Sequence, residues 1–212
     1  MSGNYSIRSI AGSYVSELQS LLDGVDLMAI EAACQTLRSA RDRHATIFIA
    51  GNGGSAATAA HWVNDLGKAT KRSGRDPFRV LSLCDNVSWL TALGNDEGYE
   101  RTFAGQLENF AEPGDILIVI SASGNSANLI KAAELARNRH MTVIALLGFD
   151  GGKLLALADR VILVATEPGA YELVEDVHSI MAHTLTKCLI ADVVRHDAAA
   201  AAVEPVDVYA SL

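Results

Sequence analysis

The chain has little cysteine, a deficit of positive charge and no long apolar run, and each absence excludes a class of protein. Its three cysteines, Cys34, Cys84 and Cys188, are far apart and follow neither metal-binding nor redox spacing, so each is interpreted as a small buried hydrophobe. Lys and Arg number 17 against 25 Asp and Glu, which gives a net charge of −8. A surface this acidic has no basic patch to offset phosphate repulsion, which argues against nucleic acid as the main partner.

Two further absences bear on location. No apolar run approaches the ~20 residues needed to cross a bilayer, and no charged-then-apolar leader opens the chain. We therefore expect no membrane partner and a cytoplasmic location. The 212 residues, half of them hydrophobic, suit one α/β domain with a full-sized core.

Apolar runs and helical segments alternate through the middle of the chain. Strands are predicted at 46–50, 78–83, 115–120, 142–147 and 160–164. Helices are expected at 54–68, 87–93, 99–111, 126–139 and 151–157, followed by a long helix over 170–196. Continuous apolar strands are typical of a parallel, doubly wound sheet covered on both faces, with ligands bound at the carboxyl ends of its strands.

Helical periodicity also covers residues 5–43, in two pieces that are broken near residues 23–26. Because this helical arm precedes the first strand, we expect it to lie outside the alternating core, where such helices often pair subunits. The alanine-rich residues 198–212 predict a flexible tail. One domain remains over 1–197, with its α/β core at 44–197.

Two loops rich in small polar residues each follow a predicted strand and open a helix: Gly-Asn-Gly-Gly-Ser-Ala-Ala at 51–57 and Ser-Ala-Ser-Gly-Asn-Ser at 121–126. Free backbone N–H groups and the positive end of a helix then point at one spot, which favours an anion. The hydroxyls of Ser121, Ser123 and Ser126 match the oxygens of a phosphoryl group. The alternative is a small-residue turn in which Ser126 caps the helix. Neither loop has the spacing of a dinucleotide or P-loop motif.

Histidines and carboxylates recur on two predicted helices. His61 and Asp65 lie one helical turn apart, a spacing that suits a metal site, shared proton transfer or a surface hydrogen bond. Glu175 and His183 lie about 80° apart around the last helix. They are close enough in direction to converge on one ligand, and the alternative for His183 is a core histidine.

The tripeptide Gly-Asn-Asp at 94–96 comes after the second predicted strand, on the ligand edge of the sheet. By itself it indicates only a turn.

Together these motifs resemble the sugar isomerase (SIS) domain family, and within it most closely the sedoheptulose 7-phosphate isomerases. The likeness extends over about residues 10–195 and includes Gly-Phe-Asp-Gly-Gly at 148–152 and Glu-Asp-Val-His with a later His at 175–183. It implies a five-stranded parallel, flavodoxin-like sheet with an N-terminal helical arm and a long C-terminal helix, assembled as a homotetramer with active sites between subunits. The implied reaction converts sedoheptulose 7-phosphate into D-glycero-D-manno-heptose 7-phosphate through an enediol(ate).

The resemblance also assigns roles to positions in this chain. The residues that match positions holding the sugar phosphate are Asn52, Gly53, Ser55, Asn95, Asp96, Ser121, Ser123, Ser126 and Glu175. The residues that match zinc ligands are His61, Asp65, Glu175 and His183. Asp65 matches the catalytic carboxylate, interpreted as the base, and His183 matches the catalytic histidine, interpreted as the acid.

Three positions depart from the family pattern. The family usually has Glu where this chain has Asp65 and Gln where it has Glu175, and a basic residue often found one turn after the carboxylate is replaced by Ala69. Aspartate has ~1.5 Å less reach, and a misplacement of 1 Å can cost about a hundredfold in rate. The exchanges leave two alternatives open, which are an isomerase or epimerase of another phosphosugar and a non-catalytic SIS protein that binds a protein partner.

Overall fold

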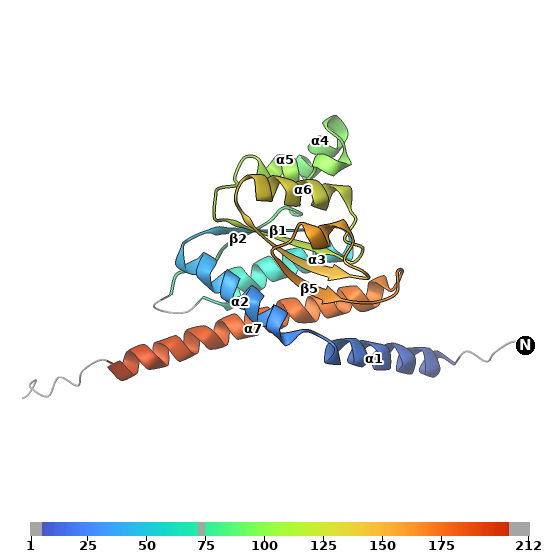
Figure 1. Cartoon of the computed structure of the whole chain (residues 1–212), viewed down its shortest axis with the longest axis horizontal. Coiled ribbons are helices and arrows are strands. Elements are labelled where there is room, and N and C mark those ends of the chain that lie inside the picture. The colour runs from blue at the N-terminus through green and yellow to red at the C-terminus, as the bar shows by residue number, and fades with distance from the viewer. Residues whose placement is uncertain (1–5, 72–74, 204–212) are drawn as a thin grey trace, which may run out of the picture.

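The computed structural model describes residues 6–71 and 75–203 and begins with two helices (Figure 1). α1 (Ile7–Asp23) and α2 (Leu27–Asp42) are separated by a short turn. The second helix begins where the carboxylate of Asp26 accepts hydrogen bonds from the backbone N–H groups two and three residues further on, at 2.8 and 3.3 Å. The predicted break of the arm is confirmed.

Only the first helix of the arm stands away from the sheet. α1 has no buried residue and extends from one side of the body in Figure 1. α2 instead buries Ile30, Ala33 and Leu37 in the core beneath the sheet. The expectation that the whole arm lies outside the core was therefore wrong for α2, because its apolar face packs into one of the two helical layers.

The sheet has five parallel strands in the order β2-β1-β3-β4-β5, which is the flavodoxin-like order. Its register places Ile49 opposite Ser82 on one side and Ile118 on the other. All five predicted strands are confirmed to within one residue at each end: β1 (Thr46–Gly51), β2 (Arg79–Ser82), β3 (Ile116–Ser121), β4 (Thr142–Gly148) and β5 (Arg160–Val164).

Helices cover both faces of the sheet, which explains why the central strands are apolar throughout. On one face, alternate strand residues such as Ile47 and Ile118 pack with α2, α3 (Gly54–Asn64) and α7 (Tyr171–Val203). On the other, residues such as Phe48 and Leu117 pack with α5 (Ala104–Leu107) and α6 (Ala127–Asn138), and Figure 1 shows these layers above and below the strands.

Three of the predicted helices have a different form. The segment at 54–68 leaves the α conformation at its last third, where η1 (Asp65–Ala69) is a π-helix. The segment at 99–111 divides into a 3-10 turn, η2 (Tyr99–Arg101), and α5. The segment at 151–157 is only a 3-10 turn, η3 (Lys153–Ala156), because Gly151 and Gly152 both have positive φ. Of the other two helices of the middle region, α4 (Val87–Asp96) is three residues longer than predicted, and α6 lies within one residue of its predicted bounds at each end.

The C-terminal helix is longer than the sequence indicates. α7 continues to Val203, so residues 198–203 of the predicted tail are helical, while residues 204–212 lie outside the described part of the chain. Cys188 on this helix is exposed, contrary to its interpretation as a buried residue, because Leu185 and Leu189 take the inward positions. Within the ranges that the structure describes, no helix is long and apolar enough to cross a membrane.

Candidate functional site

The two predicted loops meet at the carboxyl edge of the sheet. β1 and β3 are neighbours, and the chain leaves them toward opposite sides, so a crevice opens where the strand order reverses. A cavity of about 100 Å³ lies there, lined by Asn52, Ser55, Ser121, Ala122, Ser123, Ser126, Tyr171 and Glu175 together with Ile120 and Leu129. The sequence prediction of one polar pocket built from both loops is therefore consistent with the observed geometry.

The serine loop is held by its own hydroxyls. The backbone N–H of Gly124 donates to Ser121 Oγ at 3.0 Å, and the N–H of Asn125 donates to Ser123 Oγ at 3.2 Å. Each hydroxyl still has a proton to donate. Ser126 stands at the N-cap of α6 without forming a side-chain capping bond, so its expected alternative role as a cap is not observed.

The glycine loop is shaped by steric limits. Gly53 has φ of 54° just before α3, and a Cβ at Gly51 would come within 2.6 Å of the backbone oxygen of Ser55. Ser55 itself is buried in the first turn of α3, where free N–H groups point into the cavity edge. Among the described residues that line this cavity there is no lysine or arginine, so any anion in it is held by neutral donors.

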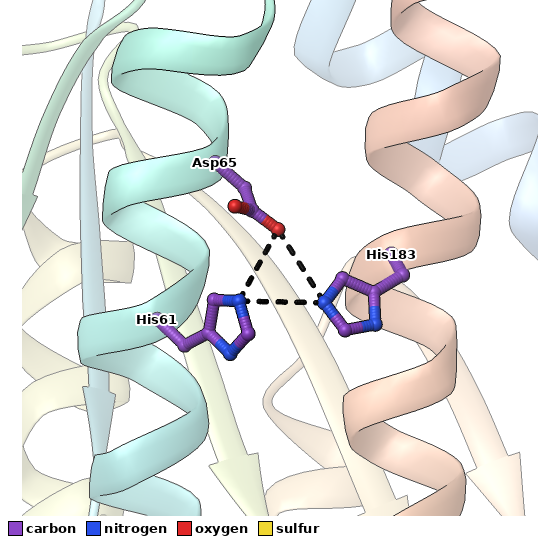
Figure 2. A group of neighbouring side chains, drawn as sticks. All are labelled: His61, Asp65 and His183. Carbon is purple, nitrogen blue, oxygen red and sulfur yellow. Dashed lines mark hydrogen bonds and ion pairs between the residues drawn. The ribbon is translucent and has the colours of Figure 1, made fainter.

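A second group forms between α3 and α7. His61 Nε2 lies 3.6 Å and His183 Nε2 lies 3.5 Å from Asp65 Oδ2, and the two Nε2 atoms are 3.4 Å apart (Figure 2). All three atoms lie within 4.8 Å of one another, close enough to share one cation. Two imidazole nitrogens and a carboxylate oxygen form a donor set that suits zinc, with a position left for a substrate. His183 is more than half exposed in its side chain and is therefore not a core histidine.

Glu175 does not belong to this group. Its carboxylate lies directly against Gly54 at the start of α3 and lines the anion cavity instead. Eight residues separate it from His183 along α7, which corresponds to about 12 Å of rise, so agreement in direction around the helix did not bring the two side chains together. Its pKa is raised above the usual value, first by burial and then by the nearby charges of Glu172 and Asp176.

Asn95 and Asp96 lie outside the cavity. They are exposed in the last turn of α4, where Asn95 Nδ2 donates to Asp96 Oδ1 at 2.7 Å. Their neighbour Gly94 lines a second, more apolar cavity of about 330 Å³ that also contains Asn52 and Tyr99. The structure thus places the tripeptide near the glycine loop without bringing its side chains to the serines.

Two residues of the site were missed from the sequence. Tyr171 lines the anion cavity, and its ring packs edge to face with Phe149 at 5.1 Å between centroids. Its position one helical turn before Glu175 was a signal that spacing could have revealed. Asn128 is buried beside Asn52, and nothing in its local sequence separates it from a surface asparagine.

A five-stranded parallel sheet covered by helices on both faces, with hydroxyl-rich loops at its crevice and a histidine–carboxylate group between α3 and α7, defines the class as an α/β domain with a polar site at its strand ends. The model of the SIS domain matches residues 13–148, and the chain belongs to that family.

Within the SIS family, the chain is similar to proteins named phosphoheptose isomerase. The phosphoheptose isomerase of Helicobacter pylori is 36% identical over 172 residues, covering 81% of this chain and 88% of the relative. That of Thiobacillus denitrificans is 34% identical over 179 residues, covering 83% and 90%. The solved phosphoheptose isomerase of Neisseria gonorrhoeae has a TM-score of 0.79 at 28% identity, over 88% of this chain and all 100% of that one. The expected family and fold are confirmed.

Proposed function

We propose that this chain is a phosphoheptose isomerase that converts sedoheptulose 7-phosphate into D-glycero-D-manno-heptose 7-phosphate. The observation that carries the proposal is the convergence of His61, Asp65 and His183 between the same two helices, α3 and α7, that contribute Ser55 and Glu175 to the hydroxyl-lined cavity. Relatives that are 31 to 40% identical bear the name of this enzyme. The retained carboxylate and late histidine favour catalysis over the alternative of a non-catalytic SIS protein.

The reaction moves a proton between neighbouring carbons of the sugar. Asp65 removes a proton from the carbon next to the ketose carbonyl, while His183 protonates the carbonyl oxygen, which gives an enediol. Asp65 then returns its proton to the former carbonyl carbon, while the hydroxyl on the neighbouring carbon gives its proton back to His183, which yields the aldose. The distance of 3.5 Å between Asp65 Oδ2 and His183 Nε2 supports this assignment, because both groups can then reach neighbouring atoms of one substrate.

The phosphate of the sugar occupies the anion cavity. Ser55, Ser121, Ser123 and Ser126 hold it through hydroxyl and backbone N–H donors, with Asn52 and Gly53 on the glycine loop. Binding energy gained at this remote group orients the reacting carbons, which is how a distant contact raises the rate.

Zinc is the metal that the donor set fits best. His61, Asp65 and His183 would hold it, and with Nε2 of His183 on the metal the carbonyl oxygen would be stabilised by the cation instead of by a proton from His183. Glu175 serves the sugar rather than the metal in this arrangement. A bound divalent cation supplies Lewis acidity toward the carbonyl oxygen. This chain has Asp65 where the family usually has Glu, and Glu175 where it usually has Gln. These two differences leave another phosphosugar as the alternative substrate.

Assembly and location remain predictions of the same proposal. We expect a homotetramer with active sites near subunit interfaces, because α1 carries exposed Ile7, Ile10 and Val15 and has no fully buried residue within its own chain. We expect the enzyme to act in the cytoplasm.

The deciding experiment is an NMR or coupled assay with sedoheptulose 7-phosphate on metal-stripped protein, with and without added zinc. Turnover that rises on addition of zinc supports both substrate and metal. Turnover that is equal in both samples removes the metal from the proposal. No turnover with zinc present, alongside activity on another sugar phosphate of a panel, replaces the substrate.

A further inference from the structure

Asn128, the second residue of α6, is only 1% exposed, and both polar atoms of its side chain form hydrogen bonds within the protein. Its Nδ2 donates to Asn52 Oδ1 at 2.9 Å and to Thr102 Oγ1 at 3.3 Å. Its Oδ1 accepts from Asn52 Nδ2 at 3.0 Å and from the backbone N–H of Leu129 at 3.0 Å. This amide has one orientation, since a flip would turn its Nδ2 toward the backbone N–H of Leu129 and set donor against donor.

The backbone N–H of Leu129 sets that orientation. A backbone N–H only donates, so Asn128 Oδ1 must face it, and Asn128 Nδ2 must then face Asn52 Oδ1. Asn52 Oδ1 also accepts from Tyr99 Oη at 2.9 Å. The amide of Asn52 is therefore oriented from two sides. Among the described residues the second N–H of its Nδ2 has no partner, and Asn52 lines the cavity that the serine loop also lines.

The same contacts fix the distance between the two loops. Asn52 directly follows the last residue of β1 and belongs to the glycine loop, whereas Asn128 follows the last serine of the serine loop by two residues. The two hydrogen bonds between the side-chain amides of Asn52 and Asn128 join these loops directly, without a long flexible side chain between them.

We propose that Asn128 is a positioning residue that holds the amide of Asn52 toward the bound phosphosugar and keeps the two loops at a fixed separation. This inference rests on the proposed function, because it assumes that an anionic ligand enters the cavity. Asn128 acts through Asn52, and the substrate touches Asn52 rather than Asn128.

A double-mutant cycle tests the route. Asn128→Ala should raise KM for sedoheptulose 7-phosphate about tenfold, the effect of one lost oriented hydrogen bond to a charged group, with kcat changed less than about threefold. In an Asn52→Ala background the same substitution should change KM less than about twofold. Asn109→Ala is the matched control, since the side chain of Asn109 donates to the backbone of Gly105 and lines neither of the cavities that contain Asn52. It should leave KM unchanged.

Tyr99→Phe gives a second measurement in case Asn128→Ala folds poorly. It removes one hydroxyl from an exposed side chain and should raise KM about threefold in the parent and not at all in the Asn52→Ala background. Equal effects in both backgrounds, or a fall in kcat with constant KM, would overturn the proposal.

Calorimetry with inorganic phosphate separates this proposal from the substrate assignment. The same cycle measured on the dissociation constant of phosphate makes no assumption about the sugar. A parent chain that binds phosphate but does not turn over sedoheptulose 7-phosphate loses only its assigned substrate, and coupling between positions 52 and 128 still supports the proposal. A parent chain that does not bind phosphate overturns the proposal.

Discussion

Asp65 has one methylene less than the glutamate that SIS isomerases usually carry, yet in this chain its carboxylate still approaches both His61 and His183. Its Oδ2 lies within 3.6 Å of both imidazoles because α3 and α7 pack closely enough to bring His61 and His183 toward it. The exposed fraction of its side chain is 18%, against 54% for His61. The carboxylate is therefore the most buried member of the group, and the two imidazole rings are more exposed to solvent.

Separate substitutions should distinguish chemistry from binding at this scale. His183→Ala removes the proposed acid and should lower kcat about a hundredfold or more with little change in KM. Ser123→Ala removes one proposed hydroxyl donor to the phosphate and should raise KM chiefly. Steady-state kinetics on both variants checks the assignment, and the opposite pattern would contradict the roles given to the two residues.

At the scale of elements, backbone geometry holds the loops together. The serine loop packs on the segment after β4, since Leu154 N donates to Gly124 O at 3.0 Å and Lys153 N donates to Asn125 Oδ1 at 3.1 Å. Gly124 has φ of 61°, and a Cβ there would collide with the backbone carbonyl of Gly151. Two loops from different strands thus need a glycine at their contact.

A matched pair of glycine substitutions tests this contact. Gly114→Ala places a methyl group at φ of 90° with no heavy atom within 4 Å, so it should cost about 1 to 2 kcal/mol of backbone strain alone. Gly124→Ala adds a collision with backbone and should cost about 1 to 3 kcal/mol more, with a higher KM. Urea unfolding measures both, and equal losses would mean that the loops separate freely.

The packing of α7 on the sheet buries an unpaired imidazole. His178 is fully buried, and neither ring nitrogen has a hydrogen-bond partner among the described residues. Burial lowers its pKa to about 4, while the nearby backbone of Leu147 acts weakly in the opposite direction. The folded state therefore keeps the ring neutral where the unfolded chain, with a pKa near 6.5, takes up a proton.

Stability should fall as the pH drops from about 6.5 to about 4, because protons bind preferentially to the unfolded chain in that window. The contribution of His178 should be about 2 kcal/mol between pH 7.5 and pH 5. Urea titrations of the parent and His178→Leu at both pH values give the difference directly. Identical pH dependence in the two proteins would contradict a buried neutral histidine.

Sequence pattern was enough for the strands, and for the loops that follow β1 and β3, because apolar runs and small polar residues are local signals. The π-helix at η1, the burial of α2 and the pairing of Asn128 with Asn52 were not predictable, since each depends on what packs against the segment from elsewhere in the chain. The case of Glu175 shows a related limit. Angular agreement on a helix says which way a side chain faces but leaves its distance from another ligand undetermined.

At the scale of the whole molecule, helix α1 exposes apolar side chains to solvent. α1 is a 17-residue helix without a buried residue, and a helix of this length is marginal in water unless it packs. Ile10 is 57% exposed on it, while Tyr14 Oη donates to Asp176 Oδ2 on α7 at 2.7 Å. This arrangement supports the proposal that other copies of the chain cover α1.

Ile10→Asp should convert the proposed tetramer into smaller species, because a carboxylate would be buried without a partner at the contact. Ser16→Asp adds the same charge to another side of the same helix and should leave assembly intact. Light scattering after size exclusion reads both masses. A parent chain that runs as a monomer would contradict the assembly proposed here.

The long final helix has a mechanical consequence. His183 sits part-way along α7, whose C-terminal end projects well beyond the strands in Figure 1. Sliding a rod of this kind along its axis by a single residue, about 1.5 Å, would pull the imidazole off Asp65. A partner that binds the protruding end of α7 and shifts the helix along its axis would therefore change the distance between His183 and Asp65. The geometry of this group thus depends in part on a segment that lies far from it.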